Sequence, residues 1–152
     1  MRRTDGPFPV YEIIPGRLYQ RGKMHDFPAE RKLRGLVRYG ITHAVVLAPP
    51  HPDPDLVAWG AADIIGYTYL PIPDGRLKKG DALLELAHGL VMEGGCVLTM
   101  CNAGRNRSGL LSALIVRELL CMTGAEALEH VRLHRPEALA NTYFEEFLRS
   151  LP

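Results

Sequence analysis

The segment SGLLSALIVRELLCMTG, residues 108–124, constrains the fold more than any other part of this 152-residue chain. Its apolar residues cover a helix on nearly all sides for about three turns, a pattern typical of a helix buried on most of its surface. The residues directly before it, GGCVLTM (94–100) and a short loop, include a glycine-bounded apolar run typical of a buried strand. A buried strand, a loop and a buried helix in this order predict an α/β core.

Strands and helices alternate along the rest of the chain. Extended pieces are predicted on both sides of the turn-forming pair Pro15-Gly16, and strands within 41–49 and 67–75. Helices are predicted within 28–40, around 56–59, and within 80–93, 124–136 and 141–151. In 28–40 the apolar side is formed by Leu33, Leu36 and Val37, and Gly40 is the expected C-cap residue. The predicted fold class is α/β: a central, mainly parallel twisted sheet of four to five strands, flanked by helices on both faces.

Composition limits the domain count and the class of partner. With 152 residues, 47% of them hydrophobic, the chain suffices for one well-filled core, so we expect a single domain over 1–152. A net charge of +1 argues against a dedicated nucleic-acid or membrane binder, because both classes usually carry a clear basic excess. No run of 18 apolar residues occurs, and no apolar segment follows Arg2 and Arg3, so a soluble cytoplasmic protein is expected.

The cysteines and histidines match no metal-binding pattern. Cys96, Cys101 and Cys121 are an odd number at spacings that fit neither a zinc site nor a disulfide framework. The six histidines show no paired metal spacing. We therefore expect free thiols in a reducing compartment, no metal and no cofactor. Cys96 and Cys121 are interpreted either as redox partners that protect Cys101 in a disulfide or as inert core residues.

The loop CNAGRNRSG, residues 101–109, joins the predicted strand to the buried helix and has the properties of an anion site. No Asp or Glu occurs between Cys96 and Val116, although acids and bases nearly balance over the whole chain. Loop N–H groups and the positive end of the helix dipole point at one spot, which suits a phosphate-like oxyanion. Gly104 permits a backbone with positive φ close to the ligand, and Arg107 offers a planar fork for two oxygens.

The same surroundings predict chemistry at Cys101. Helix N-termini and nearby arginines favour the thiolate form of a cysteine, which is the nucleophilic form. The Ser108 hydroxyl is expected to donate a hydrogen bond to the sulfur when it leaves as thiolate. The residues expected to bind the phosphate are Asn102, Ala103, Gly104, Arg105 and Asn106. The side chain of Arg105 is expected at the rim, where it either contacts a second phosphate or an acidic group, or is simply exposed.

The stretch CNAGRNRSG resembles the signature loop of the cysteine-dependent protein tyrosine phosphatases, whose small dual-specificity branch has the pattern HCxxGxxRS or HCxxGxxRT. The stretches GRLYQRG, GITHAVVLAP, YLPIPDG and RPEALANTYFEEFL resemble that family's elements in the same order. The resemblance implies a dual-specificity phosphatase-like fold and a two-step hydrolysis through a phosphocysteine, without a metal. It also implies that Arg135, Asn141 and Phe144 support the signature loop; alternatively, Asn141 is a helix N-cap and Phe144 a core residue.

Met100 departs from the family pattern, because it stands where the family has His. A methionine offers no polar contact to help fix the loop, so the thiolate is expected to be less stabilised than in relatives. We therefore expect activity that is weaker, or shifted to higher pH.

A two-step phosphoryl transfer also needs a general acid to protonate the leaving oxygen. The resemblance implies that this acid is an Asp on a mobile loop. Asp74 in PIPDG matches the family's acid by its position, because it lies at the end of a predicted strand and 27 positions before Cys101. The alternative is a turn Asp before Gly75. Asp81 is the next candidate, although it suits a helix N-cap. Asp63 is the weakest, because it falls within a predicted helix.

The predicted function is hydrolysis of phosphotyrosine in proteins, with phosphoserine and phosphothreonine as further substrates, because so short a chain has little room for loops that deepen a pocket. The predicted partner is a phosphorylated protein or peptide, and no membrane. The alternative is an RNA 5′-phosphatase or triphosphatase, or a nucleotide or inositide phosphatase, since NRSG resembles the loop end of RNA triphosphatases of this fold. A third reading, suggested only by Met100, is a non-catalytic phosphate-binding module.

Overall fold

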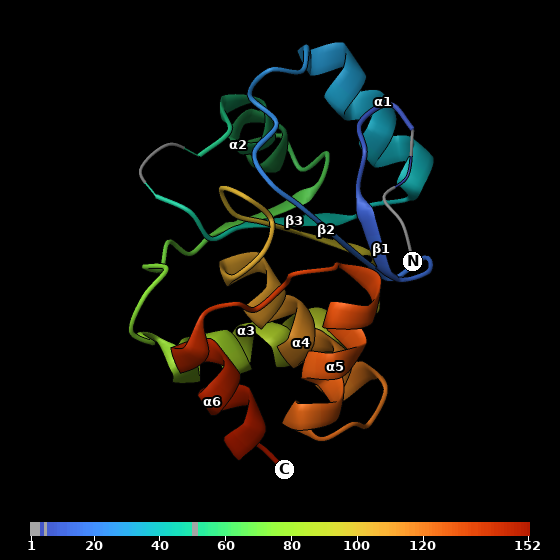
Figure 1. The fold of residues 1–152 in the computed structure, drawn as a ribbon. Helices are drawn as coiled ribbons and strands as arrows, with labels where there is room; N and C mark the ends of the chain where they lie inside the picture. Colours follow the sequence, from blue (N-terminus) through green and yellow to red (C-terminus); the bar gives the residue numbers. More distant parts are fainter. Residues whose placement is uncertain (1–3, 5, 50–51) are drawn as a thin grey trace.

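The computed structural model describes residues 4, 6–49 and 52–152. Arg2 and Arg3, considered above as the start of a leader, lie outside these residues. The described chain forms three layers, a central sheet with helices on each side (Figure 1). The predicted fold class is therefore confirmed.

In the described residues the sheet has five strands, in the order β1-β2-β5-β3-β4. Their bounds are β1 Tyr11–Ile14, β2 Leu18–Arg21, β3 His43–Val46, β4 Gly66–Tyr69 and β5 Val97–Met100. Only β1 runs antiparallel to its neighbour, and β5 lies in the centre, paired in parallel with β2 and β3. The turn between β1 and β2 contains Gly16 with φ of 71°, as the Pro-Gly pair predicts. The parallel strands all end at the same edge, where β5 leads into the signature loop.

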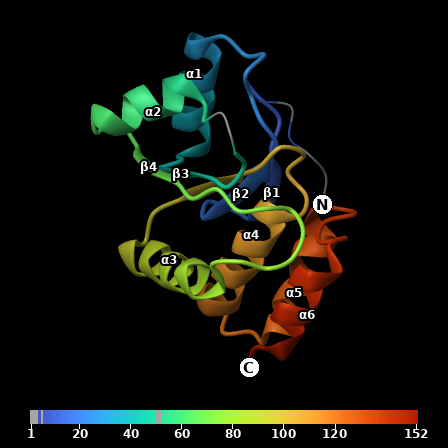
Figure 2. The same ribbon diagram turned by 90° about the vertical axis from the view of Figure 1, so that its left-hand side faces the viewer.

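Six helices of the described chain cover the sheet. They are α1 Ala29–Tyr39, α2 Pro54–Ala61, α3 Gly80–Glu93, α4 Arg107–Leu119, α5 Gly124–His134 and α6 Thr142–Ser150. Helices α1 and α2 lie on one face, and α3 to α6 lie on the other (Figure 2). Within the described residues no single helix is long and apolar enough to cross a membrane. Helices α4 and α5 reach that length and composition only when taken together, and the chain bends by 120° between them.

Each face of the sheet has its own hydrophobic core, and the central strand contributes to both. Val97 packs into the core beneath α3 to α6, whereas Leu98 and Met100 pack into the core beneath α1 and α2. This follows from the two-residue period of a strand, whose side chains alternate between faces. All ten residues from Arg107 to Val116 of α4 are buried, as the apolar pattern predicts. Cys101 and the loop that follows therefore connect the two most enclosed elements of the fold.

The buried side of α1 differs from the prediction. Val37 is 74% exposed, while Lys32 is only 3% exposed. The reason is tertiary: the Lys32 ammonium lies 2.8 Å from carboxylates of both Asp53 and Asp55. Asp53 also caps α2 by accepting hydrogen bonds from its first backbone N–H groups. A buried charge is tolerated here because it is paired across the two helices.

Candidate active site

Cys101 directly follows the last residue of β5, and its thiol is almost fully buried. Only 3% of the residue is exposed. Its Sγ lies 3.2 Å from the Oγ of Ser108, which is in the first turn of α4. The end of β5 thus positions the thiol, and the first turn of α4 places the Ser108 hydroxyl within hydrogen-bond distance of the sulfur. The structure brings together the two residues that the sequence assigned to the nucleophile and its hydrogen-bond partner.

Arg107 is the first residue of α4 and is also buried. Its Nη1 donates to the carbonyl oxygen of Ile72 (3.3 Å), in the segment between β4 and α3. Its Nε is buried and has no hydrogen-bond partner among the described residues. Buried guanidinium N–H groups are normally paired, because leaving one unpaired is costly. An oxyanion held by the loop would supply the missing acceptor.

Within the signature loop, residues 101–107, the carbonyl groups of residues 102–105 accept hydrogen bonds from the surrounding protein. The bonds are Lys23 N to Asn102 O (3.2 Å), Arg135 Nη2 to Ala103 O (3.3 Å), Gln20 Nε2 and Arg135 Nε to Gly104 O (2.9 and 3.0 Å), and Leu139 N to Arg105 O (3.3 Å). The carbonyl and N–H of one planar peptide point in opposite directions. Outward carbonyls therefore turn the N–H groups toward the centre of the loop, where an oxyanion is expected to bind.

Gly104 is needed at its position for two reasons. Its φ is 68°, in the left-handed region that favours glycine. In addition, a Cβ there would lie 2.5 Å from backbone atoms of both Arg21 and Gly22. The backbone of the loop at Gly104 is thus in close contact with the backbone at the end of β2.

Replacing Gly104 with Ala is expected to destabilise the protein by about 1–3 kcal/mol and to lower turnover of aryl phosphates by about tenfold or more, because the loop must move away from β2. Denaturant unfolding and steady-state kinetics measure the two effects. Gly89→Ala is the matched control: Gly89 lies within α3 with open space around it, so alanine there is expected to stabilise slightly without changing turnover. Wild-type turnover in the Gly104 variant would contradict the assignment of this loop.

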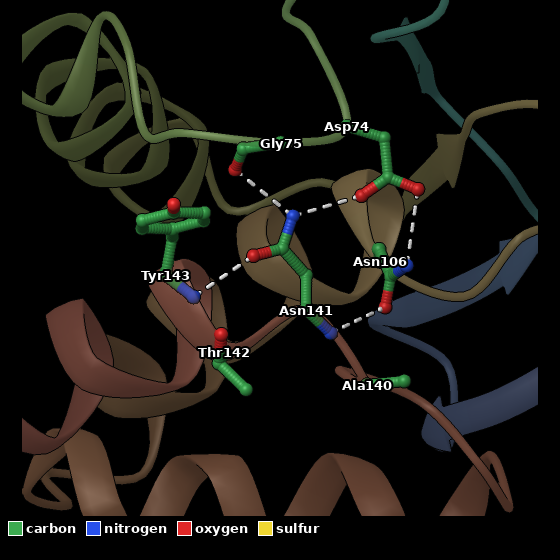
Figure 3. A pocket seen from close by; sticks show the side chains of 7 residues that line it. All are labelled: Asp74, Gly75, Asn106, Ala140, Asn141, Thr142 and Tyr143. Atoms are coloured by element: carbon green, nitrogen blue, oxygen red, sulfur yellow. Dashed lines mark hydrogen bonds between the residues drawn. The ribbon is translucent and has the colours of Figure 1, made fainter.

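Asp74 lies beside the signature loop, in the segment between β4 and α3 (Figure 3). Its Oδ2 accepts a hydrogen bond from Nδ2 of Asn106 (3.0 Å), a residue of the loop. Its Oδ1 accepts one from Nδ2 of Asn141 (2.9 Å). The Asp74 carboxylate thus contacts a residue of the loop that begins at Cys101.

The two other acidic candidates lie elsewhere in the fold. Asp63 is in the turn after α2, with φ of 57°, and not within a helix as predicted; α2 covers the face of the sheet opposite α4. Asp81 is in the first turn of α3, but Lys79 and not Asp81 takes the N-cap position, so that prediction is wrong. Asp74 is therefore the candidate for which the structure gives a contact with the loop.

A pocket of about 340 Å³ opens beside Asp74, toward the start of α6. It is lined by Asp74, Gly75, Asn106, Ala140, Asn141, Thr142 and Tyr143 (Figure 3). Arg105, on the same loop, donates from Nε to the carbonyl oxygen of Glu137 (3.2 Å). The hydrogen bond of the Arg105 side chain is thus made to a backbone carbonyl oxygen and not to an acidic side chain.

Solved structures resemble this chain over nearly its whole length. Tk-PTP in its active form matches with a TM-score of 0.73 and 28% identity, covering 93% of this chain and 95% of that one. A mutant form of Tk-PTP is 30% identical, with a TM-score of 0.70 and 91% of each chain covered. The chain belongs to the cysteine-dependent protein tyrosine phosphatases. Its fold is that of their small dual-specificity branch: human DUSP28 matches with a TM-score of 0.67 at 21% identity, over 95% of both chains. No protein-family model and no curated protein sequence matches.

Met100, the departure from this family's pattern, packs away from the loop. It is 2% exposed and belongs to the core beneath α1 and α2. The loop carbonyls are instead held by Gln20 and Arg135. Gln20 was not among the predicted site residues, although an amide in a predicted extended segment was a signal for such a role. The contact of Arg135 agrees with the supporting role that the resemblance implies, and its guanidinium also lies 4.4 Å from the ring centroid of Tyr11.

The redox-partner interpretation of the other cysteines is wrong. Cys96 and Cys101 lie at opposite ends of β5, a separation of about 16 Å at 3.3 Å per residue, whereas a disulfide needs Cα atoms within about 7 Å. Cys121 lies beyond the far end of α4, about 20 Å from the loop at 1.5 Å per residue. Cys121 is exposed, so its interpretation as a core residue is also wrong. Burial raises the pKa of the Cys96 thiol to about 11, although the nearby Arg17 opposes this. Cys96 is therefore a core residue of low reactivity.

Within residues 4, 6–49 and 52–152, no group of three or more His, Cys, Asp or Glu side chains is placed to hold a metal ion.

Proposed function

We propose that this phosphatase hydrolyses phosphotyrosine in proteins, with phosphoserine and phosphothreonine as further substrates, through a phosphocysteine at Cys101. The proposal rests on one observation: a buried thiol lies in a loop with outward carbonyls, and the buried Nε of Arg107 in the same loop has no hydrogen-bond partner within the described part of the chain. Residues 1–152 act as a single catalytic domain. Because a thiolate nucleophile must stay reduced, a reducing compartment such as the cytoplasm suits this chemistry.

In the first step the Cys101 sulfur attacks phosphorus, an S–P bond forms, and the bond from phosphorus to the leaving oxygen breaks. Arg107 and the loop N–H groups of residues 102–106 bind the phosphoryl oxygens and stabilise their charge in the transition state. Asp74 gives its proton to the leaving oxygen, so that an alcohol or phenol departs.

In the second step water attacks the phosphocysteine. Asp74, now ionised, takes a proton from the water, a new P–O bond forms, and the S–P bond breaks to release inorganic phosphate. The sulfur leaves as thiolate, and the Ser108 hydroxyl, 3.2 Å away, donates a hydrogen bond to it. The enzyme returns to its starting state without a cofactor.

The residues around the opening of the site favour a protein as the substrate. Asn102 and Ala103, at the start of the signature loop, are exposed. The segment between β4 and α3 adds only about ten residues around the opening. A low rim leaves the phosphate site within reach of the shorter phosphoserine and phosphothreonine as well as phosphotyrosine.

The competing substrate is a 5′-phosphorylated RNA, because NRSG resembles the loop end of RNA triphosphatases. We expect kcat/KM to be at least about tenfold higher on a phosphotyrosyl peptide than on a triphosphate-ended RNA oligonucleotide, since the net charge of +1 gives little general attraction for a polyanion. Phosphate release from both substrates at equal ionic strength measures this, with Cys101→Ser as the blank for each. A strong preference for RNA would overturn the proposed substrate class.

A further inference from the structure

Asn141 connects the acid-bearing segment to the start of α6. Its Nδ2 donates to Asp74 Oδ1 (2.9 Å) and to the carbonyl oxygen of Gly75 (3.0 Å), as Figure 3 shows. We propose that Asn141 is a positioning residue, whose amide holds the Asp74 carboxylate against the signature loop in the orientation needed for proton transfer. This inference rests on the proposed function, in which Asp74 is the general acid.

The orientation of the Asn141 amide is fixed by the helix that it caps. Its Oδ1 accepts hydrogen bonds from the backbone N–H groups of Tyr143 (2.9 Å) and Phe144 (3.2 Å), the first turn of α6. Because an amide carries its oxygen and its NH₂ group on opposite sides, Nδ2 must point away from the helix, toward Asp74. The helix itself is fixed by Phe144, which is fully buried. The Asn141 side chain thus caps α6 with its oxygen and binds the Asp74 carboxylate with its nitrogen.

Asn106 completes a ring of hydrogen bonds around the carboxylate. Its Nδ2 donates to Asp74 Oδ2 (3.0 Å), and its Oδ1 accepts from the backbone N–H of Asn141 (3.2 Å). The ring joins the segment after β4, the signature loop and the start of α6. Each carboxylate oxygen accepts one amide hydrogen bond, which leaves a lone pair on each oxygen for the proton that is transferred. The position of the acid therefore depends on contacts with both loop and helix.

The test is Asn141→Ser, because serine is also a good N-cap but its short side chain has no amide to reach Asp74. Rates are measured on two aryl phosphates: phenyl phosphate, whose leaving group needs a proton, and 2,4-dinitrophenyl phosphate, whose leaving group does not. We expect kcat on phenyl phosphate to fall about tenfold and kcat on the dinitrophenyl ester to change less than about threefold. Adding Asp74→Asn to this variant is expected to produce no loss beyond that of Asp74→Asn alone.

Two further variants separate positioning from helix capping. Asn141→Asp retains the best cap chemistry but has no amide N–H to donate to Asp74, so its loss on phenyl phosphate is expected to be similar to that of the serine variant. Thr123→Ala removes the N-cap of α5, at the opposite end of the helical layer, and is expected to leave the ratio of the two rates unchanged.

Equal losses on both esters in the Asn141 variants, or no loss on either, would overturn the positioning role. So would a further tenfold loss when Asn141→Ser is added to Asp74→Asn. If the proposed function itself is wrong, the result differs: Cys101→Ser then remains active, whatever the rates of the Asn141 variants.

Discussion

Replacing Cys101 with Ser is expected to abolish turnover of aryl phosphates, with kcat falling by at least about 10⁴-fold, while binding of a phosphotyrosyl peptide is retained. A serine hydroxyl is not ionised at neutral pH, whereas removal of a catalytic nucleophile in other hydrolases costs about 10⁶ in kcat. The substitution changes one atom, so Arg107 and the loop N–H groups remain available for the phosphate. Initial rates on p-nitrophenyl phosphate and titration calorimetry with the peptide measure the two quantities.

Cys121→Ser is the matched control for this experiment. Cys121 is exposed and lies beyond the end of α4, so its replacement is expected to leave turnover unchanged. Turnover that survives in Cys101→Ser would refute the phosphocysteine mechanism. If turnover is lost and binding kept, the same variant is a reagent for isolating phosphorylated proteins from cell extracts, which would name the physiological substrates.

Replacing Asp74 with Asn is expected to lower kcat on phenyl phosphate by about 10²-fold or more, because general acid catalysis typically contributes 10²–10⁴ and an amide has no proton to give. The rate on an activated ester is expected to fall far less in the first step. Since the acid works only when protonated, the variant is also expected to lose the decline of kcat at higher pH that a general acid produces. A pH series with phenyl phosphate measures this flattening.

The control for Asp74 is Asp81→Asn, in the first turn of α3. It is expected to leave the pH profile of phenyl phosphate hydrolysis unchanged. An unaltered profile in Asp74→Asn would move the general acid to another residue, and a flattened profile in Asp81→Asn would identify that residue.

The fold followed from local patterns in the sequence. The predicted helix 80–93 has the bounds observed for α3, and the apolar segment after the signature loop is the buried α4. Leucines at helical spacing indicate α3, and glycines mark both of its ends. A continuous apolar run of about three turns indicates the buried α4. The central position of β5 also agrees with its continuous apolar sequence, because a parallel strand in the middle of a sheet is covered on both faces.

Contacts between segments far apart in the sequence were not predictable in the same way. Periodicity placed Val37 on the buried side of α1, whereas an ion pair with Asp53 buries Lys32 instead. Two roles were expected for Asn141: support of the signature loop, implied by the resemblance, or the N-cap of a helix. Its second contact, with Asp74, depends on how two loops meet, and no local pattern carries that information.

Four backbone carbonyls of the signature loop, those of residues 102–105, accept hydrogen bonds from the surrounding protein, and this affects how the protein can diverge. The exposed side chains of Asn102 and Ala103 take no part in those bonds, so substitutions there are expected to alter the surface that a substrate meets while the bonds remain. Gly104 has no such freedom. Natural variation or directed evolution can therefore change substrate preference at positions 102 and 103 while the chemistry is inherited intact.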